Sequence, residues 1–493
     1  MVFISGPQID YNSKPSSYLL ILCSVSPYLN VDLMYRGRGS SSSRGPWRGR
    51  SRGLPFNSRG RGATWNKGKE PASKETVDDS PRGRLVTEIT LDNASSYGDQ
   101  AENAKISDCR YAASYSLVDS NSPKIIIPGQ PAAWKPPQLP CQLEGDHGDY
   151  LRDQNGARFK DHPMQPSVQS LFAMNKEFDP SSVDIMGCAS SLGDILRFVR
   201  SVESTFRFDV EMVGNTLFLV RNCRDQLIPD VRGYGHSFLD AFTSYDAEVE
   251  ETKSHQRIIS YSFGSLECLV RFECDGYLAD GKGGATAMTS KPENLTPPES
   301  PIDGSITAKL AGVTVSQQSV LEIKTRSLGR GLIDMNEHLP RLWLRQIPNF
   351  ITAYHERGNF ADVQEKAVHR DMIKWEIEHE SELRRFASVL RQLIVEVKRA
   401  SHLKLELCRT GLGPLELREQ CGNPREVLPS DWKDRWARQH RGLDGNGGAR
   451  LSDGDGDESS PSSSSDESES DDDDFCLDYT ACDLTCGYCG RCA

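Results

Sequence analysis

The chain has 493 residues, of which 37% are hydrophobic and 26% are charged, and its formal net charge is -12. This length could hold about two or three average domains, but the composition changes so strongly along the chain that we expect one sizeable core with unfolded ends. The apolar segment 18–29 contains serine, proline and asparagine and is shorter than a membrane span. The sequence therefore predicts neither a transmembrane helix nor a signal peptide.

Residues 34–80 form an arginine- and glycine-rich arm. If the natural start of the protein is Met34, residues 1–33 are an unrelated leader. Between Arg36 and Lys69 there are eight arginines, two lysines and no acid. Such a segment buries too little apolar surface to fold, and its interleaved aromatic residues suit stacking on bases. We expect a disordered, RGG-like arm that binds nucleic acid without sequence preference; a solubilising linker is the alternative.

Residues 110–408 carry the periodic patterns of a folded domain, with residues 280–318 as an inserted loop. The order of patterns is strand, helix, two hairpins, strand and two helices, which predicts an α/β domain, a mixed α+β sheet flanked by helices. The expected strands are 125–127, 206–210, 216–220, 258–263, 266–272 and 320–325, and the expected helices lie around 195–199, 343–354 with a kink at Pro348, and 383–397.

Two of these strands carry acidic side chains on a single face. In the strand from Leu266, alternation puts Glu273 and Asp275 opposite the apolar residues. In the strand from Val320, the same alternation puts Glu322 beside Lys324. Carboxylates on adjacent strands are suitable ligands for Mg²⁺ or Mn²⁺, and a nearby lysine can orient the attacking water. A solvated sheet face is the alternative.

Similar short patterns occur elsewhere in the chain, but their settings differ. Glu144 and Asp146 belong to a glycine- and aspartate-rich segment that predicts a loop. Glu396 and Lys398 fall inside a helical pattern, where residues two apart point to different faces. We therefore place the candidate catalytic chemistry at the two strands.

The order of these motifs resembles the DXO family of RNA 5′-end decapping nucleases and pyrophosphohydrolases, a branch of the PD-(D/E)XK nuclease fold. Glu273-Cys274-Asp275 resembles the family's Glu-h-Asp strand (h, hydrophobic), Glu322-Ile323-Lys324 its Glu-h-Lys strand, and the segment ending at Gln346 its glutamine motif. Residues 235–240 resemble the segment that supplies the first acidic ligand, with Asp240 displaced by one position.

The resemblance implies a metal-dependent hydrolase in which Asp240, Glu273, Asp275 and Glu322 hold one or two Mg²⁺ or Mn²⁺ ions. Lys324 would position the water and Gln346 would brace it. RNA 5′ ends are the implied substrate and partner. We expect an intracellular protein, in the nucleus, the cytoplasm or both. The chain departs from the family where a phosphate-binding arginine is expected, since residues 189–193 contain none. Arg232, Arg257 and His255 are candidate substitutes.

The C-terminal part differs again in composition. Residues 409–474 form a linker and an acidic tail, with eleven acids and no base from Ser452 to Asp474. Residues 475–493 are rich in cysteine. Their spacing predicts a zinc knuckle, with a reactive thiol tail as the alternative. The expected ligands are Cys482, Cys486, Cys489 and Cys492.

Three functions stay open at this point. The first is hydrolysis at RNA 5′ ends. The second is a catalytically weakened nuclease fold that serves as an RNA-binding or scaffold protein. The third is a DNA nuclease with the same ions.

Overall fold

The computed structural model describes residues 81–94, 104–119, 123–151, 153–221, 227–279, 306–422 and 425–438. All of them belong to one unit, Pro71–Ala493. The predicted arginine-rich arm and the four candidate zinc ligands lie outside the described residues. Among the described helices, none is both long enough and apolar enough to cross a membrane.

The larger sheet is mixed and runs in the order β1-β20-β19-β8-β9-β7-β13-β12-β2-β3-β15. Its strands are β1 Leu85–Ile89, β20 Leu415–Arg418, β19 Lys404–Arg409, β8 Phe206–Val213, β9 Thr216–Arg221, β7 Ile185–Cys188, β13 Leu266–Glu273, β12 Thr252–Phe263, β2 Ile106–Val118, β3 Lys124–Pro128 and β15 Thr307–Ala311. Strand β7 is parallel to both of its neighbours, β9 and β13, whereas β12 pairs antiparallel with β13 and β2.

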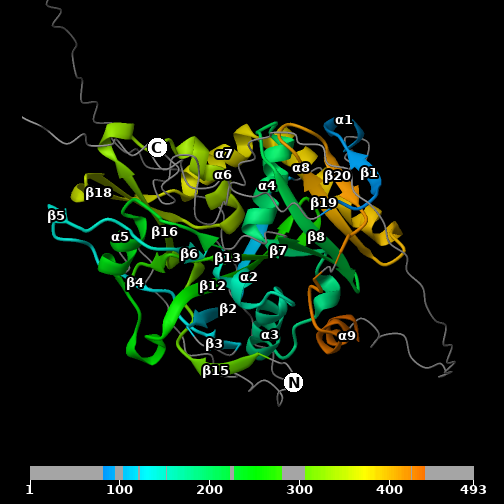
Figure 1. Cartoon of the computed structure of the whole chain (residues 1–493), viewed down its shortest axis with the longest axis horizontal. Helices are drawn as coiled ribbons and strands as arrows, with labels where there is room; N and C mark the ends of the chain where they lie inside the picture. Colours follow the sequence, from blue (N-terminus) through cyan, green and yellow to red (C-terminus); the bar gives the residue numbers. More distant parts are fainter. Residues whose placement is uncertain are drawn as a thin grey trace, which may run out of the picture. The chain divides into compact units, whose positions relative to one another are not determined.

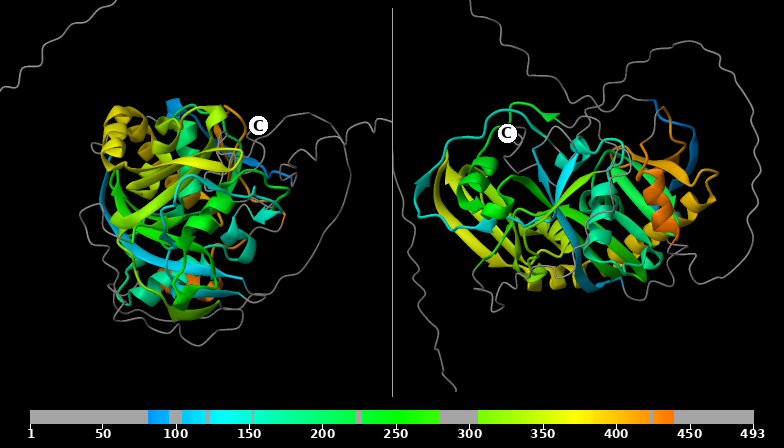
Figure 2. Two further views of the ribbon diagram at one scale, coloured as in Figure 1. Left: turned by 90° about the vertical axis from the view of Figure 1, so that its left-hand side faces the viewer. Right: turned by 90° about the horizontal axis from the view of Figure 1, so that it is seen from below.

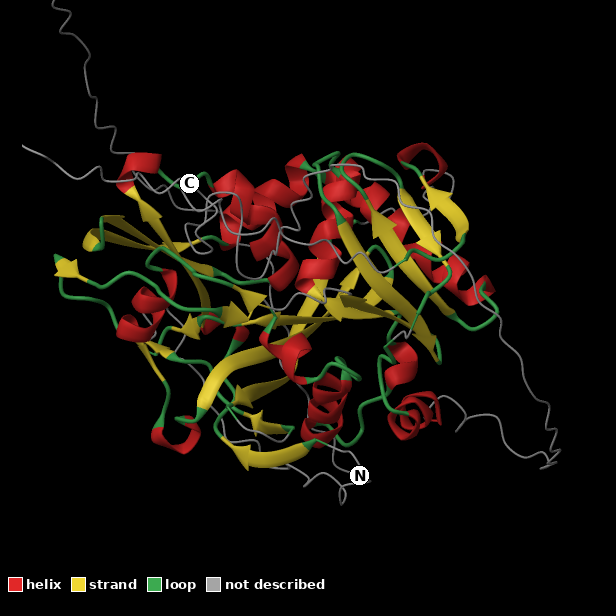
Figure 3. Cartoon of the chain, viewed as in Figure 1, coloured by secondary structure: helices red, strands yellow, loops and turns green. Residues whose placement is uncertain are grey.

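Helices cover both faces of this sheet (Figure 3). The helices of both sheets, among the described residues, are α1 Leu91–Ala94, α2 Gln154–Arg158, α3 Gln165–Met174, α4 Ala189–Val199, α5 Gly235–Phe242, α6 Met335–Arg345, α7 His369–Glu378, α8 Glu380–Arg399 and α9 Ser430–Arg438. Apolar residues of α4, α6, α7 and α8 share one buried cluster, and those of α3 and α9 share another. In Figure 1, α4, α6, α7 and α8 lie in the upper part of the view, and α3 and α9 lie in the lower part.

The smaller sheet runs in the order β11-β4-β14-β16-β17-β18-β5. Its strands are β11 Thr243–Ser244, β4 Ala133–Trp134, β14 Gly276–Tyr277, β16 Val320–Ser327, β17 Asn349–Glu356, β18 Asn359–Ala367 and β5 Cys141–Gln142. In Figure 2 the yellow β17 and β18 lie at one end and the orange β19 and β20 at the other. A separate short pair joins β6 Tyr150–Leu151 to β10 Leu227–Ile228. The predicted mixed sheet with flanking helices is confirmed.

The two predicted hairpins form where their turn residues allow a left-handed backbone. Gly264 and Ser265 have φ of 54° and 64°, the values that a tight turn between β12 and β13 requires. Gly214 has φ of 59° between β8 and β9. An added Cβ at Gly264 would lie 2.8 Å from the Ala387 Cβ of α8, so both backbone conformation and packing favour glycine there.

The helix expected around 343–354 is wrong in its second half. Helix α6 ends at Arg345, and Gln346 adopts a left-handed conformation with φ of 50°. The chain then continues as β17, which contains Ile351 and Tyr354. The apolar residues of this segment therefore belong to two elements, which a continuous three-to-four spacing cannot reveal.

The folded part extends beyond the expected 110–408. Strand β1 precedes it and pairs with β20, which follows it, so that the two ends of the domain close one edge of the larger sheet. Helix α9 also lies in the predicted linker, where Trp436 packs against Phe218. Within the expected inserted loop, residues 306–318 contain β15, which pairs in parallel with β3.

Candidate functional site

The two acidic strand motifs meet where the chain passes from the larger sheet to the smaller one. Asp275 lies between β13 and β14, and its Oδ2 accepts a hydrogen bond from the backbone amide of Ile323 on β16 at 2.9 Å. Ile323 is the residue between Glu322 and Lys324. The predicted neighbourhood of Asp275 and Glu322 is therefore present in the structure.

Alternation along both strands sets the direction of these side chains. Leu266, Val270 and Cys274 belong to the buried cluster that contains α4, α6 and α8 residues, which leaves Glu273 and Asp275 on the other face of the strand. On β16, Leu321 and Ile323 pack in the cluster of the smaller sheet. Glu322 and Lys324 accordingly point to the opposite side, toward α6.

Glu322 is 2% exposed and lies among three cations. Its Oε1 accepts a hydrogen bond from Arg341, its Oε2 lies 3.3 Å from an Nη of Arg345, and the Nζ of Lys324 lies 3.8 Å from its Oε1. Although burial opposes ionisation, the two arginines and the lysine lower the pKa of Glu322 to about 2. Glu322 is therefore a carboxylate at neutral pH.

Arg341 and Arg345 are functional candidates that the sequence analysis missed. They are four residues apart on α6, so both project from one face of the helix toward β16. His338 lies one turn earlier and receives a hydrogen bond from Arg341 at 3.2 Å. Two arginines at this spacing, on the helix that follows a Glu-x-Lys strand, could have indicated a carboxylate or phosphate contact.

Asp275 experiences a different electrostatic environment. Burial raises its pKa, and the negative charge of Glu322 raises it further, while Lys324 and the Ile323 amide act in the opposite direction. The proximity of two carboxylates accounts for the second effect. A proton or a cation between the two groups would relieve this repulsion.

The charges of three carboxylates act on the phenol of Tyr245, which follows β11. Burial raises the pKa of Tyr245, and so do the charges of Glu273, Asp275 and Asp240. All three acids therefore lie within electrostatic reach of one hydroxyl. The pKa of Asp240 on α5 is itself raised by burial and by Asp146.

Asp146 has a definite role that its loop setting concealed. It is 8% exposed, and its Oδ1 accepts hydrogen bonds from the amide and hydroxyl of Ser237 at 2.8 and 2.6 Å, while Oδ2 accepts from the His236 amide at 3.2 Å. It thus caps the N-terminus of α5, the helix that carries Asp240. A cap supplied from about 90 positions earlier in the chain cannot be found from local spacing.

His236 stacks on Tyr150, with ring centroids 3.6 Å apart and an interplanar angle of 16°. Burial lowers the pKa of His236 to about 4; the charge of Lys324 lowers it and that of Asp146 opposes the shift. The imidazole is therefore neutral at pH 7, close to the lysine of the Glu-x-Lys strand.

The remaining predicted site residues have other surroundings. The Nε2 of Gln346 donates to the Trp343 carbonyl at 2.7 Å, so its amide closes the end of α6 in this structure. Arg257 is 0% exposed and donates to Gln317 and to the Val315 carbonyl, and His255 is 1% exposed and hydrogen-bonded to Ser116. Neither of these two reaches a surface, which argues against the predicted phosphate contacts. Arg232 is exposed and pairs with Asp230 at 2.7 Å.

The donor chemistry fits Mg²⁺ or Mn²⁺ in type, because Asp275 and Glu322 offer hard oxygen atoms at a point where two negative charges repel each other. Arg341 and Arg345 already neutralise Glu322. In the part of the chain that the structure describes, no group of three or more histidines, cysteines or acids is arranged to hold a metal ion.

A family model described as "Domain of unknown function (DUF8563)" matches residues 98–404, more than half of the chain. The chain belongs to this family. The candidate metal and catalytic residues described above, from Asp240 to Gln346, lie within that range. No curated protein matches the sequence.

The DUF8563 chain is similar to several solved structures at low sequence identity. Scheffersomyces stipitis Rai1 in complex with (3′-NADP)⁺ and calcium ion is 13% identical, with a TM-score of 0.46 over 73% of this chain and 99% of that chain. Candida albicans Rai1 in complex with pU5-Mn²⁺ is 10% identical, with a TM-score of 0.45 over 71% and 98%. K. lactis Dxo1 in complex with manganese is 9% identical, with a TM-score of 0.38 over 70% and 96%.

Proposed function

We propose that the chain is a hydrolase that uses a divalent metal ion to cleave phosphate linkages at RNA 5′ ends. The observation that carries this proposal is the hydrogen bond between Asp275 and the amide of Ile323, which holds the Asp275 carboxylate beside Glu322 and Lys324. The RNA 5′ end as substrate rests on the resemblance of the Glu-x-Asp and Glu-x-Lys strands to the DXO motifs.

Each residue of the site has a role that its surroundings suit. Asp275 and Glu322 would hold the ion, with Asp240 and Glu273 as further ligands from the group around Tyr245. Such an ion supplies Lewis-acid activation of the phosphate and a more acidic water. Lys324, 11% exposed, is near enough to Glu322 to orient a water or offset charge on the phosphate. We leave Gln346 out because its amide caps α6.

The arginines of α6 favour a second function. Both oxygens of Glu322 contact a guanidinium group, so a metal ion at Glu322 would have to compete with two cations that are already in place. A site in which arginines replace the ion would bind a phosphate group without hydrolysing it. Such a site corresponds to the second function considered from the sequence, a catalytically weakened nuclease fold that binds RNA.

Turnover of defined substrates separates these functions. The full chain is incubated with Mn²⁺ and RNA bearing a 5′-triphosphate, an incomplete cap or an NAD cap, with DNA as a parallel substrate. We expect Asp275→Asn and Glu322→Gln to lose at least about 100-fold in rate. Glu396→Gln, in the Glu-x-Lys pattern of helix α8, is the matched control and should keep the wild-type rate.

The outcomes assign the function. RNA turnover that both site variants lose supports the proposal. RNA binding with no turnover in the wild type supports the arginine-filled site, and cleavage of DNA in preference to RNA supports the DNA nuclease.

A further inference from the structure

A small pocket lies between β13, β9, α2 and the start of α4. Its side chains are strongly cationic: it contains three arginines and one acid. It is lined by Asp153, Gly156, Pro163, Met164, Cys188, Val220, Arg221, Arg271 and Arg425. We propose that this pocket binds a phosphate group of the nucleic acid, as a contact separate from the reacting centre.

Arg271 is the central residue of the pocket. It is 5% exposed, one Nη donates to the Cys188 sulfur at 2.7 Å, and the other donates to the Tyr115 hydroxyl at 3.4 Å. Its Nε is buried and has no hydrogen-bond acceptor among the described residues. A buried guanidinium normally has its donors satisfied, so this Nε is a donor that a bound anion would use.

Asp153 is the acid that lines the pocket. It lies 3.9 Å from an Nη of Arg271, and its other oxygen accepts a hydrogen bond from the Gly156 amide at the start of α2. The lining thus combines three guanidinium groups with one carboxylate, a composition rich in the donors that a phosphate accepts.

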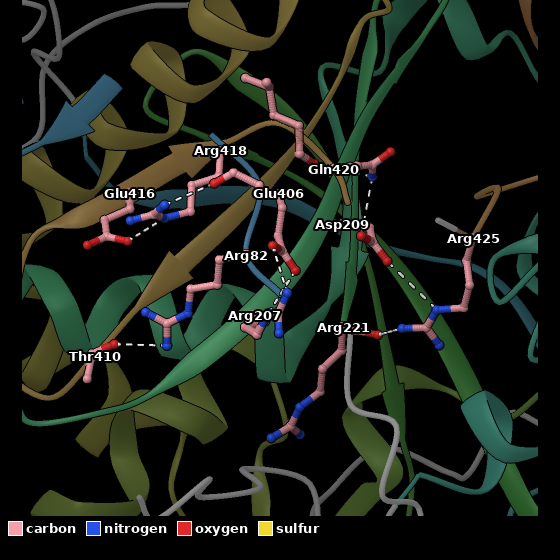
Figure 4. A network of polar contacts seen from close by, with 12 residues as sticks. Arg82, Arg207, Asp209, Arg221, Glu406, Thr410, Glu416, Arg418, Gln420 and Arg425 are labelled. Atoms are coloured by element: carbon pink, nitrogen blue, oxygen red, sulfur yellow. Dashed lines mark hydrogen bonds and ion pairs between the residues drawn. The ribbon is translucent and has the colours of Figure 1, made fainter. Parts of the chain in front are cut away.

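Arg425 reaches the pocket from the segment before α9. Its Nε lies 3.7 Å from Asp209 on β8, and an Nη donates to the Arg221 carbonyl at the end of β9. Figure 4 shows this arrangement, with the side chain of Arg221 directed away from Asp209. The guanidinium of Arg425 thus pairs with an acid through its Nε, and the residue also lines the pocket.

The start of α4 adds a further favourable element. Cys188 lines the pocket, occupies the N-cap position of this 11-residue helix and makes no side-chain capping bond. The N-terminus of a helix favours anions because its first amides have no partner within the helix. Together with the buried Nε of Arg271, it supplies donors of the kind that a phosphate accepts.

The position on β13 relates the pocket to the candidate active site. Arg271, Glu273 and Asp275 share one face of the strand, and the span from Arg271 to Asp275 is about 13 Å at the usual rise of a strand. This is too far for one phosphate to contact both ends. The inference rests on the proposed function for its ligand: the pocket would hold one phosphate of a strand while another lies at the carboxylates.

Binding is measured without metal, so that no cleavage is needed. A labelled, 5′-phosphorylated single-stranded RNA is titrated by fluorescence anisotropy in EDTA against the wild type, Arg271→Lys, Arg425→Gln and Arg385→Gln. Arg385 is an exposed arginine on α8 and serves as the control. We expect Arg271→Lys and Arg425→Gln to weaken binding about tenfold each. Arg425→Gln removes a positive charge and should reduce the slope of log affinity against log salt by about 0.7, whereas Arg271→Lys keeps its charge and should leave the slope nearly unchanged.

A second arm uses inorganic phosphate alone. It should raise the melting temperature of the wild type and of Arg385→Gln but not of the two pocket variants. Because Arg425 is 19% exposed on its side chain, its variant keeps the test valid if Arg271→Lys does not fold. RNA affinity equal to that of Arg385→Gln in both pocket variants would overturn the proposal, and so would a phosphate effect without RNA affinity.

The result is independent of hydrolysis. Loss of RNA affinity in the pocket variants supports the pocket even if the wild type shows no turnover with Mn²⁺, a finding that would remove the proposed enzymatic function alone.

Discussion

Arg345 contacts Glu322 across 3.3 Å and thereby ties helix α6 to strand β16 at the centre of the candidate site. Arg341, one turn earlier, contacts the other oxygen of the same carboxylate. The two arginines therefore stabilise the Glu322 carboxylate when no ion is bound, and a bound ion would compete with them for its oxygen atoms.

Replacing Arg345 with glutamine should destabilise the chain by about 1.5–3 kcal/mol, because it removes a charged hydrogen-bond partner from a carboxylate that is 2% exposed. Unfolding in urea measures the change. Mn²⁺ should restore part of the loss by replacing the missing positive charge. Arg385→Gln, an exposed arginine on α8, should change stability little; an equal loss in both variants would contradict the role of the Arg345 contact.

The contribution of Glu322 should depend on pH. Its pKa is lowered in the folded chain to about 2 from an ordinary 4.5, so its stabilising effect is complete above pH 4.5 and is lost as the pH falls toward 2. The free energy of unfolding of the wild type should therefore exceed that of Glu322→Gln most near pH 6, and the gap should narrow in acid. A gap that stays constant from about pH 6 to about pH 3 would exclude a lowered pKa.

Asp275 should show the opposite dependence. Its pKa is raised in the folded chain, so the group favours folding when protonated at low pH, and this advantage is lost as the pH rises through the folded-state value. Asp275→Asn keeps an oxygen that can accept from the Ile323 amide and removes the charge. We expect a higher melting temperature than wild type at pH 7 in EDTA, with the difference shrinking in acid. A lower melting temperature at pH 7 would contradict this account.

Asp146→Ala should cost about 1–2 kcal/mol, because it removes the acceptor for the first amides of α5. Asp146→Asn keeps one acceptor and should cost less. If α5 positions Asp240 for an ion, Asp146→Ala should also weaken Mn²⁺ binding, as measured by calorimetry. Unchanged stability in Asp146→Ala would show that the cap is not needed for α5.

The sequence predicted the parts of the site that depend on strand alternation. Glu273, Asp275, Glu322 and Lys324 each lie on the expected face because the apolar residues between them pack into the core. The hairpins followed from Gly214 and Gly264. The sequence did not predict the surroundings of Gln346. The left-handed backbone there directs the chain into β17, and the side-chain amide donates to the Trp343 carbonyl of α6.

The missed residues are those whose contacts join distant segments. Asp146 caps a helix about 90 residues later, and Arg341 and Arg345 meet a strand that precedes α6. Arg257 and His255 look available in the sequence, yet their strand β12 lies inside the larger sheet between β13 and β2. Burial of a polar side chain in a central strand is a property of the whole sheet, so local patterns do not reveal it.

Mn²⁺ binding to the full chain at pH 7 tests most directly whether Asp275 and Glu322 hold one ion. It is measured by calorimetry for the wild type, Asp275→Asn, Glu322→Gln and the control Glu396→Gln. Ions held by the acidic segment 452–474 contribute equally to all four, so the differences report the site alone. We predict one class of tight binding in the wild type and the control that both site variants lack. Identical binding curves for all four proteins would contradict the claim that Asp275 and Glu322 hold a common ion.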